Sequence, residues 1–299
     1  MNMSGAKLSL GLHKLQKVVA DAFGLTARGI KNNADAKAYA AKVKAENENA
    51  IALIKARGKY ELAEFIENKE QLKFANVQSV CGCAEKELKS EESVSEKELD
   101  QDWVNRFFSI IEGISKPQVQ ELWGKILAGE IKNPGAFSFR TLETLKNISQ
   151  EEALVFQRLS PLIFLPSRDA FFNKDISIAD KICLSDAGLI HPEELVKILT
   201  FPENQQKTHF CISRTRALTF YTNKTTPQKI KIPFYQLTRS GKELATLLPS
   251  VEDEEYIDAL CEIAQKAGVS KVTKSSIIKW EEDRFSWDPN TEVLVASFV

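Results

Sequence analysis

The sequence lacks the features that mark most enzymes and membrane proteins. No uninterrupted apolar run approaches the roughly 18 residues that a membrane-spanning helix requires. Neither a glycine-rich phosphate loop nor a nucleophile elbow occurs. The three histidines, His13, His191 and His209, show no metal-ligand spacing. We therefore expect a protein with no transmembrane segment, no cofactor and no catalytic activity.

Cysteine is also scarce, and its arrangement fits no disulfide framework. Small secreted domains pair their cysteines, whereas this chain has an odd number, five, at Cys81, Cys83, Cys183, Cys211 and Cys261. The Cys81-Gly82-Cys83 step supplies two thiols where structural zinc requires four ligands. The first residues also lack the charged, apolar and small order of a cleaved signal. These absences predict a cytoplasmic protein without a structural metal.

Neither sign of charge dominates the chain. Its formal net charge is −1, so it lacks the strongly basic balance of a protein that binds nucleic acid over its whole surface. Charge is nonetheless segregated along the sequence, because basic residues outnumber acidic ones between Lys7 and Lys59 and the order reverses between Glu61 and Asp102. These two segments could attract each other or separate partners.

An amphipathic helix is predicted near the N-terminus. Residues 8–23 carry apolar residues at spacings of three and four, with Lys14 and Lys17 off that line. A docking or oligomerisation helix is the simpler interpretation. The alternative is a helix that lies on an anionic membrane surface, with its apolar side buried among the lipids.

Residues 33–75 predict one long helix or two in line, because Ala, Lys and Glu predominate and no proline occurs. The apolar residues of this stretch, among them Leu62, Phe65 and Leu72, are sparser than in a core helix. That pattern favours self-association as a helical stalk. An acidic linker completes this N-terminal region, which we assign to residues 1–100.

Residues 101–165 predict a central bundle of short helices. Ser115, with Gln118 three residues later, is the expected cap of a helix that runs to about Ile131. Ser138 is the next expected cap. Ser149 and Glu152 repeat the capping-box pattern before a further helix.

The same segment carries the motifs of a known family. They are Trp123-Gly-Lys-Ile-Leu-Ala-Gly-Glu, Pro134-Gly-Ala-Phe-Ser and Arg140-Thr-Leu, followed later by Leu237-Thr-x-x-Gly-x-x-Leu. With these motifs nearly the whole chain resembles the bacterial domain-of-unknown-function family 2806. That resemblance implies no assigned activity and no catalytic residues. The Leu122-Trp123 helix also resembles a segment of abortive-infection-type phage-defence proteins, which implies a stress or phage-defence setting.

Residues 166–299 predict an α+β domain that resembles a winged helix. A helix over 176–185 leads through Gly188 to strands at 210–213, 217–221 and 229–237, with a turn at 223–227. Ser240 and Glu243 form a further expected capping box. A helix over 256–267 and strands at 276–280 and 292–298 close the domain. The fold class is thus mainly α, with an α+β C-terminal part.

The leading functional hypothesis is a binding, scaffolding or regulatory protein, with a DNA-binding regulator and a peripheral membrane protein as alternatives. Glu121, Glu130, Arg140 and Glu143 could do chemistry only if they converged in a pocket, and capping or solvated pairs explain them more simply. A winged module could use hairpin cations on DNA, yet no helix offers a convincing set of base-reading side chains. The candidate interaction residues are Trp103, Arg106, Trp123, Arg140, Arg214, Arg216, Lys229, Lys231, Arg239 and Lys242.

Overall fold

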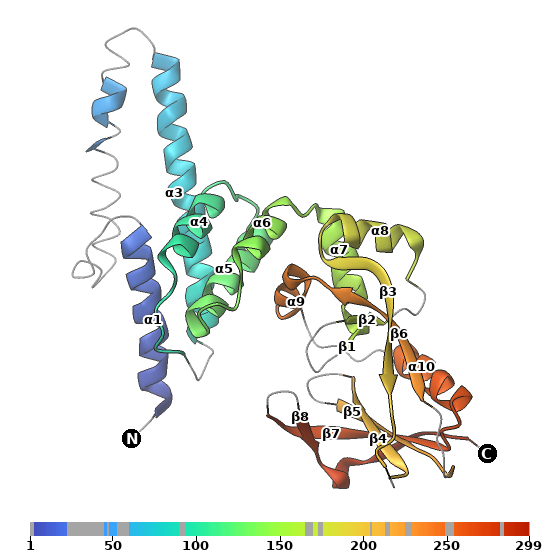
Figure 1. The fold of residues 1–299 in the computed structure, drawn as a ribbon. Coiled ribbons are helices and arrows are strands. Elements are labelled where there is room, and N and C mark those ends of the chain that lie inside the picture. Colours follow the sequence, from blue (N-terminus) through green and yellow to red (C-terminus); the bar gives the residue numbers. More distant parts are fainter. Residues whose placement is uncertain are drawn as a thin grey trace. The chain divides into compact units, whose positions relative to one another are not determined.

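The chain forms two compact units, Met1–Leu142 (unit 1) and Glu143–Val299 (unit 2). The computed structural model describes residues 3–22, 45–46, 48–52, 60–89, 94–164, 170–172, 176–203, 205–212, 216–224, 229–248, 254–281 and 284–298. The described elements of unit 1 are helical, whereas unit 2 combines helices with two sheets (Figure 1). The predicted fold class, mainly α with an α+β C-terminal part, is confirmed.

Unit 1 is a bundle in which α3 packs along α5, and α1 contacts α3, α4 and α5 (Figure 1). The contacts thus group part of the predicted N-terminal region with the first half of the predicted central bundle. Most of the helix predicted over 33–75 lies outside the described residues. The helices are α1 (Met3–Ala22), α3 (Tyr60–Lys89), α4 (Gln101–Ile111), α5 (Pro117–Lys132) and α6 (Phe139–Asn147), which spans the boundary between the units.

A cluster of aromatic rings, one pair stacked and one pair edge-on, lies in the core of unit 1. The ring centroids of Trp103 and Phe107 lie 5.1 Å apart, and those of Phe107 and Trp123 lie 5.6 Å apart. The indole Nε1 of Trp103 donates a hydrogen bond of 2.7 Å to the carbonyl oxygen of Phe137. Satisfying that buried donor removes the main cost of placing tryptophan in a core.

The contact between α3 and α5 depends on Gly124. A Cβ atom at position 124 would lie 2.4 Å from the Cβ of Cys83 and 3.0 Å from the backbone nitrogen of Ala84. Backbone atoms cannot move aside as the end of a flexible side chain can. The absence of a side chain at this position therefore sets how closely the two helices approach.

The caps of the helices test the sequence predictions directly. Both bonds of the Ser149 and Glu152 capping box are present, so that prediction is confirmed. The Ser115 prediction was wrong by one residue, since Lys116 is the N-cap and Pro117 occupies the first helical position that proline favours. The Ser240 prediction was also wrong. Thr238 caps α9, because the helix begins directly after a strand and Thr238 Oγ1 accepts from the Gly241 nitrogen.

Unit 2 contains four α-helices and two antiparallel sheets among its described residues. The helices are α7 (Gln150–Leu159), α8 (Ile178–Asp186), α9 (Arg239–Ala245) and α10 (Glu254–Lys266), with short 3-10 turns at Ser160–Leu162 and Pro289–Thr291. The first sheet has the order β1 (Ile163–Phe164), β2 (Ala170–Phe172), β6 (Ile230–Leu237), β3 (Ile190–Leu199). The second has the order β4 (Lys207–Cys211), β5 (Arg216–Tyr221), β7 (Lys271–Glu281), β8 (Arg284–Trp287), with β9 (Val293–Ser297) also on β7.

Strand pairing in unit 2 differs from the local pattern in the sequence. The predicted hairpin of 217–221 with 229–237 was wrong, because β5 pairs with β4 and β7 whereas β6 pairs with β2 and β3. Strand β3 was not predicted at all. The winged-helix resemblance stays a prediction: α8 leads through Gly188 into β3, which pairs with β6, but β4 and β5 intervene in the chain.

We predict that the same substitution has opposite effects at two helical glycines. Gly124→Ala should lower the free energy of unfolding by about 1–3 kcal/mol, because its Cβ overlaps the backbone of α3. Gly82→Ala, on α3, should raise it by up to about 1 kcal/mol, because nothing lies within 4 Å of the added Cβ and alanine is the better helix former. Urea unfolding followed by circular dichroism measures both, and equal effects would contradict this account of the helix contact.

Candidate functional site

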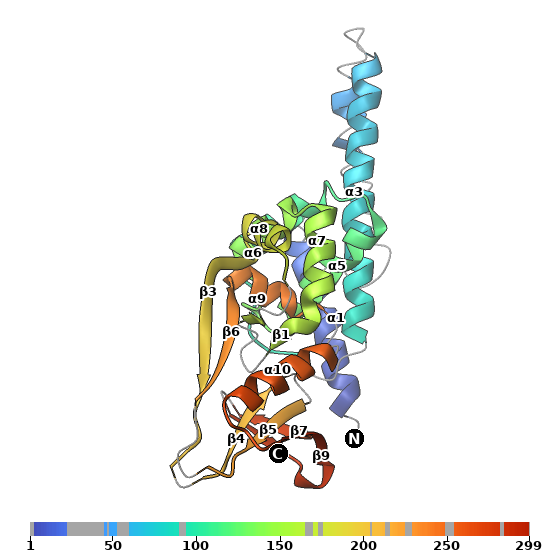
Figure 2. The same cartoon turned by 90° about the vertical axis from the view of Figure 1, so that its right-hand side faces the viewer.

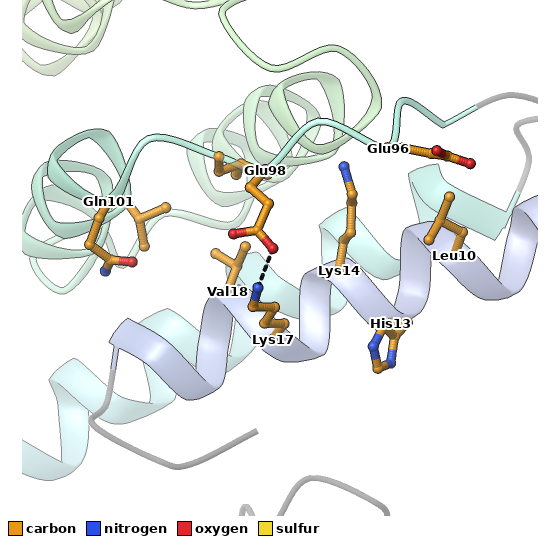
Figure 3. Close-up of a pocket in the computed structure, with 10 residues that line it drawn as sticks. Leu10, His13, Lys14, Lys17, Val18, Glu96, Glu98 and Gln101 are labelled. Atoms are coloured by element: carbon orange, nitrogen blue, oxygen red, sulfur yellow. Dashed lines mark hydrogen bonds and ion pairs between the residues drawn. The ribbon is translucent and has the colours of Figure 1, made fainter. Parts of the chain in front are cut away.

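A pocket of about 240 Å³ lies in unit 1, between α1 and the segment that leads into α4. Figure 3 shows Lys14 reaching toward that segment and Glu98 reaching back toward α1. The pocket thus brings part of the basic N-terminal segment against part of the acidic one. Its lining consists of Leu10, His13, Lys14, Lys17, Val18, Glu96, Glu98, Leu99, Gln101 and Val104.

The polar groups of this pocket bind one another. Lys17 Nζ donates to Glu98 Oε1 at 2.6 Å (Figure 3), and this hydrogen bond holds the pKa of the Glu98 carboxyl below its usual value. Lys14 Nζ donates to the carbonyl oxygen of Lys97. Burial lowers the pKa of Lys14 despite the attraction of Glu98 and Glu96. The two lysines therefore hold α1 against the segment before α4. The basic and acidic segments were predicted either to attract each other or to separate partners, and these residues attract each other.

The apolar side of α1 faces into unit 1. Leu15 and Val18 are only 6% and 7% exposed, and α1 contacts three other helices of the unit. This is the geometry of a docking helix. A role at a membrane surface would require α1 to leave these contacts. Within the described part of the chain, no helix has both the length and the apolar character needed to cross a membrane.

The candidate residues of the central helices do not form one site. Trp103 and Trp123 are 2% and 0% exposed, so both belong to the core rather than to an interaction surface. Arg106 and Arg140 are exposed on α4 and α6. Glu130 is buried, and its carboxylate accepts from the backbone nitrogens of Gly135 at 2.6 Å and Phe137 at 2.9 Å. That carboxylate therefore holds the turn after α5.

The candidate cations of unit 2 are distributed over two strands and a helix. Arg216 on β5 donates to Ser276 Oγ, and Arg239 Nε on α9 donates to Glu243 Oε1 at 2.7 Å. Lys229, directly before β6, and Lys231, on β6, are exposed. Lys242 on α9 is half-buried, and Arg214 lies outside the described residues.

A polar cluster on the second sheet was not predicted from the sequence. The register places His209, Thr219 and Thr273 side by side on one face of β4, β5 and β7. His209 Nδ1 lies 2.9 Å from Thr219 Oγ1, and the His209 ring lies 3.8 Å from the ring of Trp287 on β8. Burial, with the nearby charge of Lys207, lowers the pKa of His209 to about 4. A histidine in this environment is neutral at physiological pH.

The thiols of Cys81 and Cys261 are held in the protonated form. Burial raises the pKa of Cys81 to about 12, and burial likewise raises that of Cys261 to about 11. A thiol with such a pKa is protonated at neutral pH, whereas the thiolate is both the nucleophile and the metal ligand. Over the described ranges, no group of three or more His, Cys, Asp and Glu side chains could hold a metal ion.

Exposed apolar side chains gather on α3. Leu62, Phe65 and Leu72 are 47%, 62% and 64% exposed. Spacings of three and seven residues bring them to one side of the helix, and we name them the α3 stripe. Further along the same helix, Val77 and Val80 are 3% and 0% exposed. Helix α3 is therefore a core helix over its C-terminal half, and its N-terminal half buries Ala63 but presents the three side chains of the stripe to solvent.

Comparison with known proteins yields one family. The sequence model of the family described as Protein of unknown function (DUF2806) matches residues 62–172 and 168–261. These spans contain most of α3, the helices α4 to α9 and the whole of the first sheet. No curated protein and no solved structure matches the chain.

We predict that Lys17→Gln raises the pKa of Glu98 toward its usual value, because the hydrogen bond and the positive charge that favour the carboxylate are lost. A carboxyl whose pKa is lowered by folding stabilises the fold above its unfolded pKa, and this contribution is lost as pH falls through the folded pKa. NMR titration of the glutamate carboxyl carbons measures the shift. Lys69→Gln, on α3, is the matched control, and an unchanged Glu98 pKa in Lys17→Gln would refute the contact.

We predict that the His209 cluster weakens the fold in mild acid. The folded pKa of about 4 lies below the ordinary 6.5, so the unfolded chain takes up a proton first and stability falls as pH drops from about 6.5 toward 4. His209→Gln should remove this loss of unfolding free energy, which is on the order of 1–3 kcal/mol over the whole pH range. Urea unfolding across that pH range tests it. His191→Gln, at an exposed histidine, should keep the slope of the parent protein.

Proposed function

The chain belongs to the DUF2806 family of proteins of unknown function, and we propose that it is a non-enzymatic scaffolding or regulatory protein that binds a protein partner through the α3 stripe. The supporting observation is the exposure of Leu62, Phe65 and Leu72 on one side of a helix whose other half is fixed in the core. Each such side chain gains about 1.5–3 kcal/mol when it passes from full exposure to full burial. Because these side chains are about half exposed, a partner that buried them would gain a large part of this burial free energy.

The surroundings of the α3 stripe also suit an interface. Glu61, Glu64 and Lys69 are exposed on the same helix, so an apolar centre is flanked by charged side chains that can remain solvated. Phe65 is an aromatic residue, and aromatic side chains are enriched among those that dominate binding energy. The rigid C-terminal half of α3 lowers the entropy cost of presenting the stripe.

A DNA-binding role is the second candidate, and exposed Lys229 and Lys231 favour it. The outer side of α8 argues against it, because Ile178 and Ile182, one turn apart, are 75% and 56% exposed. Base recognition needs long polar side chains on the helix that enters the groove. A DNA-binding protein should also lose affinity steeply as salt rises.

Two further roles follow from packing and from resemblance. Binding to an anionic membrane through residues 8–23 would release Leu15 and Val18 from unit 1, so it requires undocking of α1. A stress or phage-defence setting is part of the proposal, and it rests on the resemblance of the Leu122-Trp123 helix to phage-defence proteins.

We predict that the triple variant Leu62→Gln, Phe65→Ser and Leu72→Gln loses a protein partner that the parent chain captures. The exposed apolar area is removed while the buried residues of α3 are kept, so helix content should be unchanged by circular dichroism. Affinity capture from native cells with nuclease present, followed by mass spectrometry, measures the loss. The matched control is Glu61→Gln with Glu64→Gln on the same part of α3.

Equal capture by the triple variant and the control would refute the stripe as the binding surface. Capture that disappears from the parent protein on nuclease treatment would instead favour the DNA-binding candidate.

A further inference from the structure

Strand β3 is an open and apolar sheet edge. It ends the order of the first sheet, and Figure 2 shows it beside β6 at the margin of that sheet. Among the residues that the structure describes, no strand pairs with its outer side. Leu195, Val196 and Ile198 are 41%, 51% and 48% exposed. An exposed apolar edge of this length is a template for pairing with another strand.

The pairing with β6 determines which backbone groups of β3 face outward. Pro233 lies opposite Val196 and has no N–H group, so these residues form a non-hydrogen-bonded pair. Directly after β6, the Thr238 nitrogen donates to the Leu189 carbonyl oxygen at 2.9 Å. The backbone N–H and C=O groups of the even-numbered residues of β6 therefore point toward β3. Both observations agree. The N–H and C=O groups of Glu194, Val196 and Ile198 therefore point away from β6.

We propose that β3 pairs antiparallel with the β3 of a second copy of this chain, about a two-fold axis at Leu195. This register opposes Leu195 to its own copy and Glu194 to Val196, so outward-facing backbone groups meet each other. It also brings Glu193, which lies in the register shift between Ile190 and Glu194, opposite Lys197 twice, once on each side of the axis. Both side chains are exposed, and opposite charges in such pairs stabilise a sheet.

Neighbouring registers lack these matches. A shift of one residue opposes outward-facing backbone groups to groups that already face β6, so the ladder cannot form. A shift of two residues toward the C-terminus places Lys197 opposite Leu195 and removes both charge pairs. A two-fold interface is closed, because the same surface serves both copies and no free β3 edge remains for a third.

Such pairing would join the first sheets of the two copies into one continuous sheet. A dimer would also carry two α3 stripes, so a partner with two sites would bind with higher effective affinity. The pairing does not depend on the α3 proposal, because β3 and the α3 stripe belong to different units of the chain.

Charge reversal on the intact chain tests the proposed pairing. Light scattering after gel filtration, over a series of protein concentrations, should show a dimer of the parent protein. Lys197→Glu should weaken dimerisation at least tenfold, because it places two carboxylates opposite each other. The double variant E193K/K197E should restore it, since the opposite charges meet again. Lys229→Glu, at an exposed lysine outside the proposed ladder, is the control and should dimerise as the parent does.

A cross-link tests the register. Leu195→Cys should form a disulfide between the two copies under mild oxidation, because Cα atoms in a non-hydrogen-bonded pair lie about 4.5 Å apart, within disulfide reach. Ile198→Cys should not, because position 198 lies away from its own copy. A parent protein that stays monomeric at every concentration overturns the proposal, and so does a dimer insensitive to Lys197→Glu. A dimer in which Leu195→Cys fails to cross-link overturns the register.

Discussion

The close contact between α3 and α5 is the constraint on which unit 1 depends. Gly124 lets α5 approach the backbone of α3 near Cys83, and Trp123 beside it packs edge-on against Phe107 in the core. Helix α1 packs on the pair so formed, and Lys14 and Lys17 fasten it to the segment before α4. Because these contacts involve the C-terminal half of α3, Leu62, Phe65 and Leu72 in the N-terminal half stay exposed, although Ala63 beside them is buried.

Unit 2 divides its strands between two sheets, and this division leaves particular surfaces open. Strand β6 takes the central position between β2 and β3, so within the described part of the chain β3 is paired on one side alone. Proline at position 233 is tolerated in β6 because its missing donor does not fall in the ladder with β3. The α3 stripe is exposed because it lies beyond the contact of α3 with α5. The β3 edge is exposed because β3 pairs with β6 on one side.

Local features of the fold could be read from the sequence, whereas long-range pairing could not. The Ser149 and Glu152 capping box needs only residues three apart, and the structure contains it. The predicted caps Ser115 and Ser240 were wrong. Pro117 occupies the first position of α5, and α9 begins after Thr238, directly behind the end of β6. The turn residues between β5 and β6 indicated a hairpin, but the partners of each strand lie far away in the chain.

The candidate surfaces show the same limit. Sparse apolar residues over 33–75 indicated a helix that associates with another surface, but the pattern did not separate the exposed α3 stripe from Ile51, which is buried. The His209 cluster draws on strands far apart in the sequence, so no local signal predicted it. Strand β3 was missed because Pro192 and its charged neighbours resemble a loop. Those same residues are compatible with an edge strand, where proline and charge are tolerated.

The most direct test of partner binding through α3 is photo-crosslinking in native cells. A photoreactive amino acid is placed at position 65, in the α3 stripe, or at position 78, where Gln78 is exposed on the same helix. We predict a covalent adduct with one defined protein from position 65 and none from position 78. The absence of any adduct from position 65, or the same adduct from both positions, would contradict it.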